Sequence, residues 1–210
     1  MKRTSLKNIE AFRITDSHTN EVFYGCNQEW FGTHWQRLSG CGPSVVSNLI
    51  LYRTRTNPTR DDKINDKASC LSLMEEVWGY VRPTPRGIPS TELLCGFVKA
   101  YGLSKDERVV CSHCEIPDDS SLRPSSGEVV SYIERALDAD APVAFLNLCN
   151  GDENNLDEWH WVTIVSLARS DPGGHAMARI LDKGGMNDID LTLWLDTTQN
   201  GGGFVYFTLR

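Results

Sequence analysis

Apolar residues recur at every third or fourth position in four parts of the chain, which is the spacing of a helix that buries one face. This spacing predicts helices over residues 42–52, 68–80, 90–102 and 127–138. Pro43 fits the first turn of the first helix, where a missing N–H does no harm. Ser90 is a good N-cap for the third helix, and Gly102 suits the left-handed residue that ends many helices. Residues 53–67 are polar and predict a solvated loop.

The last third of the chain has a different pattern, with runs of β-branched and aromatic residues between turn residues. These runs predict strands over residues 142–148, 159–167, 176–182 and 203–209. The turn chemistry of residues 170–174 predicts that the middle two strands form a hairpin. Residues 189–195 fit either a strand or a short helix, because Trp194 interrupts the alternation of isoleucine and leucine.

Helices that precede antiparallel strands predict an α+β class, with a helical lobe facing a sheet lobe. The 210 residues are enough for one sizeable core, and no repeat or low-complexity tract divides them. We therefore expect residues 1–210 to form a single domain. Its helical lobe should cover about residues 36–138 and its sheet lobe about residues 142–210.

The charge balance argues against several classes of partner. The chain has 21 Lys and Arg against 28 Asp and Glu, a net charge of −7, so we expect it to bind neither nucleic acid nor an anionic membrane. The longest apolar stretches fall short of the roughly 18 to 20 residues that span a bilayer. The first residues lack the apolar centre of a secretory signal, and we therefore expect a cytoplasmic protein.

The number of cysteines also agrees with the expected cytoplasmic location. Seven cysteines are an odd number without an export signal, so we expect most of them to be thiols. Cys111 and Cys114 form the one close pair, and His113 lies between them. A metal site there would need a fourth ligand that the local sequence does not offer, so we expect a structural role. We expect no metal and no cofactor.

Cys41 is the first candidate for chemistry. It lies at the N-terminal edge of the first predicted helix, where unpaired N–H groups and the helix dipole favour the thiolate and should lower the pKa. Gly40 and Gly42 would leave the backbone free to turn and would let a substrate carbonyl approach the Cys41 amide. The same residues also fit a structural helix entry, and both interpretations stay open.

His160 and Asp182 are candidates for the base and for the group that orients it. His160 begins a predicted strand, and histidine is suited to proton transfer near neutral pH. Counting back from the hairpin turn places Asp182 opposite either Trp161 or His160. Asn187 and Asp188 are substitutes for Asp182. His160 is otherwise a half-buried residue at a strand end, and Asp182 simply ends its strand.

Four segments then resemble, in order, the landmarks of papain-like cysteine peptidases of the C39-like type: Gln36 to Pro43, and residues 137–144, 159–165 and 180–182. The resemblance runs from about Gln36 to the C-terminus, but residues 53–123 match only as generic helices. It implies a papain-like fold in which the nucleophile helix packs against a C-terminal antiparallel sheet. It also implies that Cys41 is the nucleophile, His160 the base, Asp182 its orienter, and a glutamine the partner of the Cys41 N–H in holding the oxyanion.

Gln36 departs from the family's pattern, because it precedes Cys41 by five positions where six are usual, and Gln28 is more distant still. We expect a cysteine hydrolase that cleaves a peptide or a small amide through an acyl-enzyme on Cys41. An amidase or an acyl or peptidyl transferase would use the same nucleophile. A catalytically inactive papain-like binding module is the other alternative. The acidic loop 150–158 either biases the cleft toward cationic or neutral substrates or is only a solvated surface loop.

Overall fold

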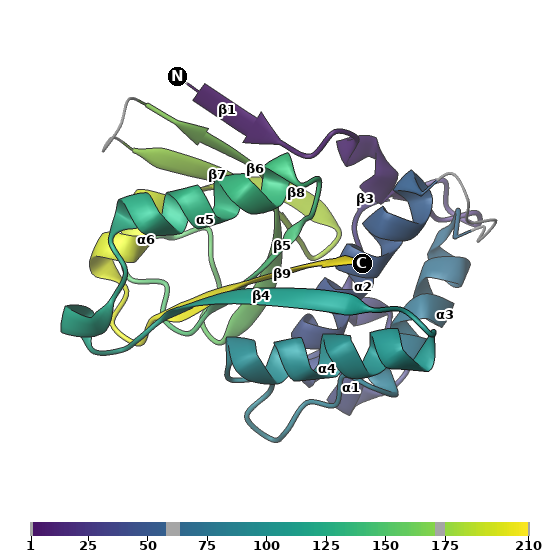
Figure 1. Ribbon diagram of the computed structural model, residues 1–210. Coiled ribbons are helices and arrows are strands. Elements are labelled where there is room, and N and C mark those ends of the chain that lie inside the picture. Colours follow the sequence, from purple (N-terminus) through teal and green to yellow (C-terminus); the bar gives the residue numbers. More distant parts are fainter. Residues whose placement is uncertain (1, 58–63, 171–174, 210) are drawn as a thin grey trace.

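The computed structural model describes residues 2–57, 64–170 and 175–209 (Figure 1). Its helices are α1 (His34–Ser39), α2 (Cys41–Thr56), α3 (Lys67–Trp78), α4 (Thr91–Ser104), α5 (Ser126–Asp138) and α6 (Leu191–Thr197). Its strands are β1 (Lys2–Ser5), β2 (Arg13–Thr15), β3 (Val22–Tyr24), β4 (Val109–Ile116), β5 (Val143–Asn147), β6 (His160–Arg169), β7 (Ala176–Asp182), β8 (Gly185–Asp190) and β9 (Gly202–Leu209). Short 3₁₀ turns are η1 (Ile9–Phe12), η2 (Gln28–Trp30) and η3 (Ser120–Leu122).

The main sheet is antiparallel and has seven strands, in the order β4-β9-β5-β6-β7-β8, with β1 also paired to β6. Strand β5 pairs with residues 160–164 of β6 and β1 pairs with residues 166–169. Because β7 occupies the other edge of β6, β5 and β1 follow one another along the same edge. Strand β6 is therefore central, and its first eight residues are all buried.

Helix α2 is the central helix of the fold. Every residue from Cys41 to Tyr52 is buried, and the helix packs against β5, β6 and α3. Inside this contact the buried Asn48 donates a hydrogen bond to Thr163 Oγ1 (3.0 Å) and accepts one from the Cys26 N–H (2.7 Å). These bonds fix α2 against β6, so the N-terminus of the helix is held at one end of the sheet. In Figure 1 helices α1 to α4 gather on one side of the molecule, whereas α5 and α6 lie on the other.

The four helices and four strands that the sequence predicts are present, and the α+β class is confirmed. Two details differ. Helix α2 continues through residues 53–56 of the expected loop, and residues 58–63 lie outside the described part of the chain. Helix α4 runs past Gly102, where a Cβ atom would come within 2.2 Å of Val109 Cγ2. Gly102 therefore allows α4 and β4 to approach closely and does not end the helix.

The sheet takes two strands, β1 and β4, from outside the range expected for a sheet lobe. Their partners, β6 and β9, lie far away in the sequence, so local patterning gave no indication of the pairing. Residues 189–195, which fit either a strand or a short helix, contain the end of β8 and the first part of α6. Strand β8 ends at Asp190, whose side chain caps α6 by accepting a hydrogen bond from Leu193 N (2.9 Å). Of the predicted turn over residues 170–174, residues 171–174 lie outside the described part of the chain.

Cys95 on α4 and Cys111 on β4 form a disulfide, with Cα atoms 5.8 Å apart, and the other five cysteines are free. Most cysteines are thus thiols, as expected. The disulfide takes Cys111 out of the Cys111–His113–Cys114 group, and His113 Nδ1 lies 3.1 Å from Thr91 Oγ1. Cys111 is therefore not a free thiol ligand, and a structural role for the group stays a prediction. Within the described ranges, no helix is long and apolar enough to cross a membrane.

Candidate active site

Cys41 is the first residue of α2 and is 9% exposed. Helix α1 ends at Ser39, so a single residue, Gly40, separates the two helices. The thiol therefore sits at a helix N-terminus, where the unpaired N–H groups of the first turn favour negative charge.

The two glycines beside Cys41 are required by packing. Gly40 has a right-handed backbone (φ −81°), and a Cβ atom there would lie 2.4 Å from the Gln36 carbonyl oxygen and 2.9 Å from the Phe31 ring. A Cβ atom on Gly42 would lie 2.5 Å from Ile88 Cδ1. The expected conformational reason for these glycines is therefore wrong. They let Phe31 and Ile88 pack closely around the start of α2.

His160 and Asp182 are joined by a hydrogen bond of 2.7 Å between Nε2 and Oδ1. They are the first residue of β6 and the last residue of β7. The register differs from both alternatives expected from the turn, because Thr163 lies opposite Leu181 and Asp182 is level with Val162. A β-bulge between Ile164 and Ser166 shifts the pairing, so the bond to His160 runs diagonally.

The two substitutes for Asp182 lie on β8. Asp188 forms hydrogen bonds of 2.8 Å with Arg179 through both carboxylate oxygens. Asn187 is exposed and pairs with Ile180 across the strands. Asp182 is therefore the carboxylate that holds the His160 ring.

The imidazole of His160 is hydrogen-bonded to Asp182, and Cys41 is close enough to influence its pKa. Because Nε2 faces Asp182, Nδ1 is the ring nitrogen left for the thiol. Burial by itself lowers the pKa of His160, but the hydrogen bond to Asp182 and the interactions with the Asp182 and Cys41 side chains raise it to about 10. The site therefore favours the imidazolium at neutral pH.

A second carboxylate, Asp157, also approaches His160. The ligand atoms of Asp157, His160 and Asp182 lie within 4.8 Å of one another. Asp157 forms an ion pair with Lys183, and this hydrogen bond lowers the pKa of Asp157 and raises that of Lys183. Asp157 is thus paired with the cationic Lys183, and Asp182 is paired with the protonatable ring of His160.

The loop before His160 is held from its buried side. Asn147 on β5 is fully buried and donates a hydrogen bond to the Asp157 carbonyl (2.7 Å). Trp194 Nε1 in turn donates to Asn147 Oδ1 (2.8 Å). Asn147 is also the cross-strand partner of His160. Asn147 was not among the predicted site residues, although an asparagine inside the apolar run 142–148 is a signal for a buried polar contact.

Gln36 does not join the other predicted site residues. Its Oε1 accepts hydrogen bonds from the N–H and hydroxyl of Thr33 (3.2 and 2.9 Å), which completes a capping box at the start of α1. Its Nε2 donates to Glu75 Oε2 (2.7 Å). Gln36 lines neither of the described cavities that contain Cys41. The Thr33-x-x-Gln36 spacing is a capping-box signature that the sequence already contains.

Gln28, and not Gln36, shares a cavity with Cys41. It lines a small cavity of about 20 Å³ together with Cys41, His160 and Asp182, which is room for about one water molecule. Its Nε2 donates one hydrogen bond to the Arg37 carbonyl (2.8 Å), and an amide nitrogen carries a second hydrogen. No local pattern distinguishes Gln28 in the sequence, because it lies in η2 and reaches Cys41 only through the fold.

A groove opens beside Cys41. It has a volume of about 570 Å³ and is lined by Trp35, Leu38, Ser39, Cys41, Pro85, Arg86, Gly87 and Trp159. We call it the thiol groove. Trp35, Leu38 and Trp159 are 46%, 65% and 57% exposed, which is unusual for large apolar side chains. The groove therefore presents apolar surface beside Cys41.

Comparison with known proteins identifies the fold. No protein-family model matches the sequence, and no curated protein sequence matches it significantly. Seven chains of solved structures match. One of these is the crystal structure of UfSP from C. elegans, with a TM-score of 0.58 and 15% sequence identity, covering 100% of this chain and 34% of that chain. The chain thus spans about a third of the length of this structural neighbour.

UfSP is a cysteine protease with a papain-like fold. The chain therefore has a papain-like α+β fold, as its sequence led us to expect. At 15% identity the likeness establishes the fold alone, so the chemistry has to be argued from the residues around Cys41.

Proposed function

We propose that the protein is a cysteine hydrolase that cleaves a peptide or amide bond through an acyl-enzyme on Cys41. The observation that carries this proposal is the His160 ring, which lies between the Asp182 carboxylate and a thiol at the N-terminus of a buried helix. A papain-like fold with a cysteine protease as its neighbour agrees with a hydrolase. The C39-like type remains a proposal from the sequence motifs, and so does a cytoplasmic location.

In the proposed reaction the Cys41 thiolate attacks the carbonyl carbon, and the carbonyl oxygen becomes an oxyanion. The Cys41 N–H and the second amide hydrogen of Gln28 hold that oxyanion. The His160 imidazolium gives its proton to the leaving amine as the C–N bond breaks, which leaves an acyl-enzyme. Neutral His160 then takes a proton from water, which attacks the thioester and releases the acid. The proton taken from water restores the imidazolium, and breakage of the C–S bond of the thioester restores the thiolate.

Asp182 keeps the ring in the orientation that this cycle needs. By accepting a hydrogen bond from Nε2, it leaves Nδ1 directed toward the sulfur and stabilises the imidazolium. We assign Gln28, in place of Gln36, to the oxyanion site, because Gln28 shares the small cavity with Cys41 and Gln36 does not. Gln36 is assigned to the cap of α1.

The test is selective alkylation followed by an activity assay. Iodoacetamide at a pH near 6 should label Cys41 ahead of the other free thiols. Cys149 is the sharpest internal control, because backbone hydrogen bonds from Gln199, Gly151 and Asn200 lower its pKa although no histidine is paired with it. Labelling of Cys149 ahead of Cys41, or slow labelling of all thiols alike, would favour an inactive binding module.

Transfer of the acyl group is separated from hydrolysis by adding amines. A hydrolase releases mainly the acid from its acyl-enzyme, whereas a transferase releases the new amide in proportion to the amine concentration. Unchanged turnover of an amide substrate by Cys41→Ala would contradict both versions of the proposal.

A further inference from the structure

A second hollow adjoins the thiol groove. It has a volume of about 460 Å³, and its walls include Pro89, Glu115, Asp118, Leu148 and Trp159. We call it the acidic hollow. Trp159 lines both spaces, and the connector between α3 and α4 borders both, with residues 85–87 in the thiol groove and Pro89 in the acidic hollow. The two spaces are therefore neighbours separated by one tryptophan side chain.

Trp159 has an unusual backbone. Its φ is +54°, a left-handed conformation that a bulky residue rarely adopts. Trp161, two residues further along the chain, is 3% exposed and donates its Nε1 hydrogen to the Ile88 carbonyl (2.8 Å). In contrast, Trp159 is 57% exposed. The left-handed residue directs this side chain away from the sheet at the point where the chain enters His160. Such a conformation tends to be kept where it serves a site.

The two spaces differ in chemistry. The thiol groove presents Trp35, Leu38 and Pro85, with Arg86 as its one charged residue. The acidic hollow presents Glu115 and Asp118 and no lysine or arginine. Both of these acids are exposed, and neither forms an ion pair within the described residues. One space thus suits an apolar side chain, and the other suits a cation.

We propose that the substrate is a peptide that lies across Trp159. A large apolar side chain occupies the thiol groove, and a basic side chain on the other side of Trp159 reaches Glu115 and Asp118. Trp159 is the specificity-determining residue that keeps the two side chains apart. This inference rests on the proposed function, because it takes the groove beside Cys41 as the place where the substrate binds.

The first experiment measures binding without turnover. Cys41→Ala is titrated with fluorescent peptides that carry leucine or aspartate on one side of a central glycine pair and lysine or glutamate on the other, in both chain directions. In the productive direction the leucine–lysine peptide should bind best. Leucine should exceed aspartate by at least about tenfold, and lysine should exceed glutamate by about fivefold at low salt. Equal binding of all peptides in both directions overturns the inference.

The second experiment assigns the preferences to residues. In the Cys41→Ala background, Glu115→Gln should lower the lysine-to-glutamate ratio, whereas the charge-matched control Glu21→Gln, on the β2–β3 turn, should leave it unchanged. Trp159→Ala should lower the leucine-to-aspartate ratio, whereas Leu103→Ala, which removes an exposed apolar side chain (74%) from α4, should not. Thermal unfolding confirms that each variant is folded. Ratios that are the same in Glu115→Gln and Trp159→Ala as in the parent contradict the assignment.

The outcomes separate this inference from the proposed function. If the parent protein cleaves amides and labels at Cys41 but the peptides bind alike, the hydrolase stands and the substrate inference is wrong. If the peptides bind in the expected order but the parent cleaves none of them and Cys41 is unreactive, the groove is a peptide-binding site of an inactive module.

Discussion

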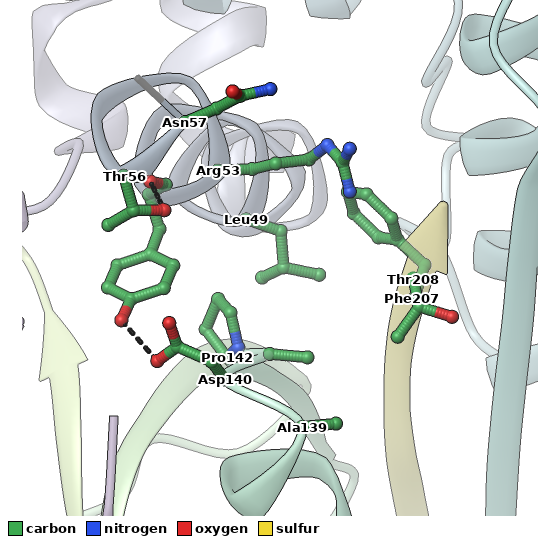
Figure 2. A pocket seen from close by; sticks show the side chains of 11 residues that line it. Leu49, Arg53, Thr56, Asn57, Ala139, Asp140, Pro142, Phe207 and Thr208 are labelled. Atoms are coloured by element: carbon green, nitrogen blue, oxygen red, sulfur yellow. Dashed lines mark hydrogen bonds between the residues drawn. The ribbon is translucent and has the colours of Figure 1, made fainter. Parts of the chain in front are cut away.

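The two ends of α2 each border a hollow, but they have different chemistry. At the N-terminal end, Cys41 opens into the thiol groove of about 570 Å³. At the C-terminal end, a hollow of about 430 Å³ is lined by Leu49, Arg53, Asp140 and Thr208, among others (Figure 2). The volumes are similar, so size does not distinguish the two ends of the helix. The polar groups and the polarity of the helix do.

In the far hollow the polar groups bind one another. The Tyr52 hydroxyl donates to Asp140 Oδ1 (2.6 Å), and the Lys7 N–H donates to the same oxygen (2.9 Å). Burial and the bond to Asp140 raise the pKa of Tyr52 well above its usual value, so its proton stays in place. These contacts tie the N-terminal segment and the α5–β5 turn to α2. At the Cys41 end the Asp182 carboxylate instead binds the His160 ring, and both side chains line a small cavity together with Cys41.

Removing the thiol should give the largest effect of any substitution in the molecule. Cys41→Ala should lower kcat/KM on an amide substrate by about 10⁴-fold or more, because no other group can form the acyl-enzyme. Cys149→Ala is the matched control and should retain parental activity. Steady-state kinetics with a fluorogenic amide measures both. Comparable losses in the two variants would show that the Cys41 thiol has no special role in turnover.

Asp182→Asn tests whether the carboxylate orients the ring. It should lower kcat by about 10² to 10⁴-fold, because an amide partner no longer stabilises the imidazolium or fixes its tautomer. It should also move the alkaline limit of activity to lower pH, since Asp182 helps to raise the pKa of His160. Asp188→Asn, whose parent carboxylate binds Arg179, is the control. A pH–rate profile that does not move would argue that Asp182 has only a structural role.

Gln28→Ala should lower kcat by about 10² to 10³-fold, the usual cost of one oxyanion donor, with little change in KM. Gln36→Ala should instead lower the free energy of unfolding by about 1 kcal/mol through loss of the α1 cap, with activity retained. Kinetics and chemical denaturation of the two variants are compared side by side. The reverse pattern would return the oxyanion role to Gln36.

These two glutamines mark the limit of what the sequence could predict. Cys41, His160 and Asp182 were found because a helix start and two strand ends are local patterns, and the structure brings all three together. The register was missed because the bulge after Ile164 has no clear sequence signal. Gln28 was named but judged too distant in the sequence, because its place depends on how η2 packs beside α2, which is long-range information. Strands β1 and β4 were missed for the same reason.

The pH dependence should follow the raised pKa of His160. The imidazolium gains its partners in the folded state, so its contribution to stability is fully present below its ordinary pKa near 6.5 and is lost as the pH rises through about 10. Activity should persist to alkaline pH and fall about tenfold for each pH unit above 10. A bell-shaped profile whose alkaline limb lies near pH 7 would contradict the raised pKa of His160.

The smallest effect is expected at the far end of α2. Tyr52→Phe removes the hydroxyl that binds Asp140 and leaves that carboxylate with the Lys7 N–H, so the free energy of unfolding should fall by about 1 kcal/mol. Activity on an amide substrate should not change, because that hollow shares no lining residue with the described cavities that contain Cys41. Urea denaturation and kcat/KM are measured on the same preparation. A loss of activity larger than the loss of stability explains would mean that the two ends of α2 are coupled, and that the far hollow belongs to the working part of the molecule.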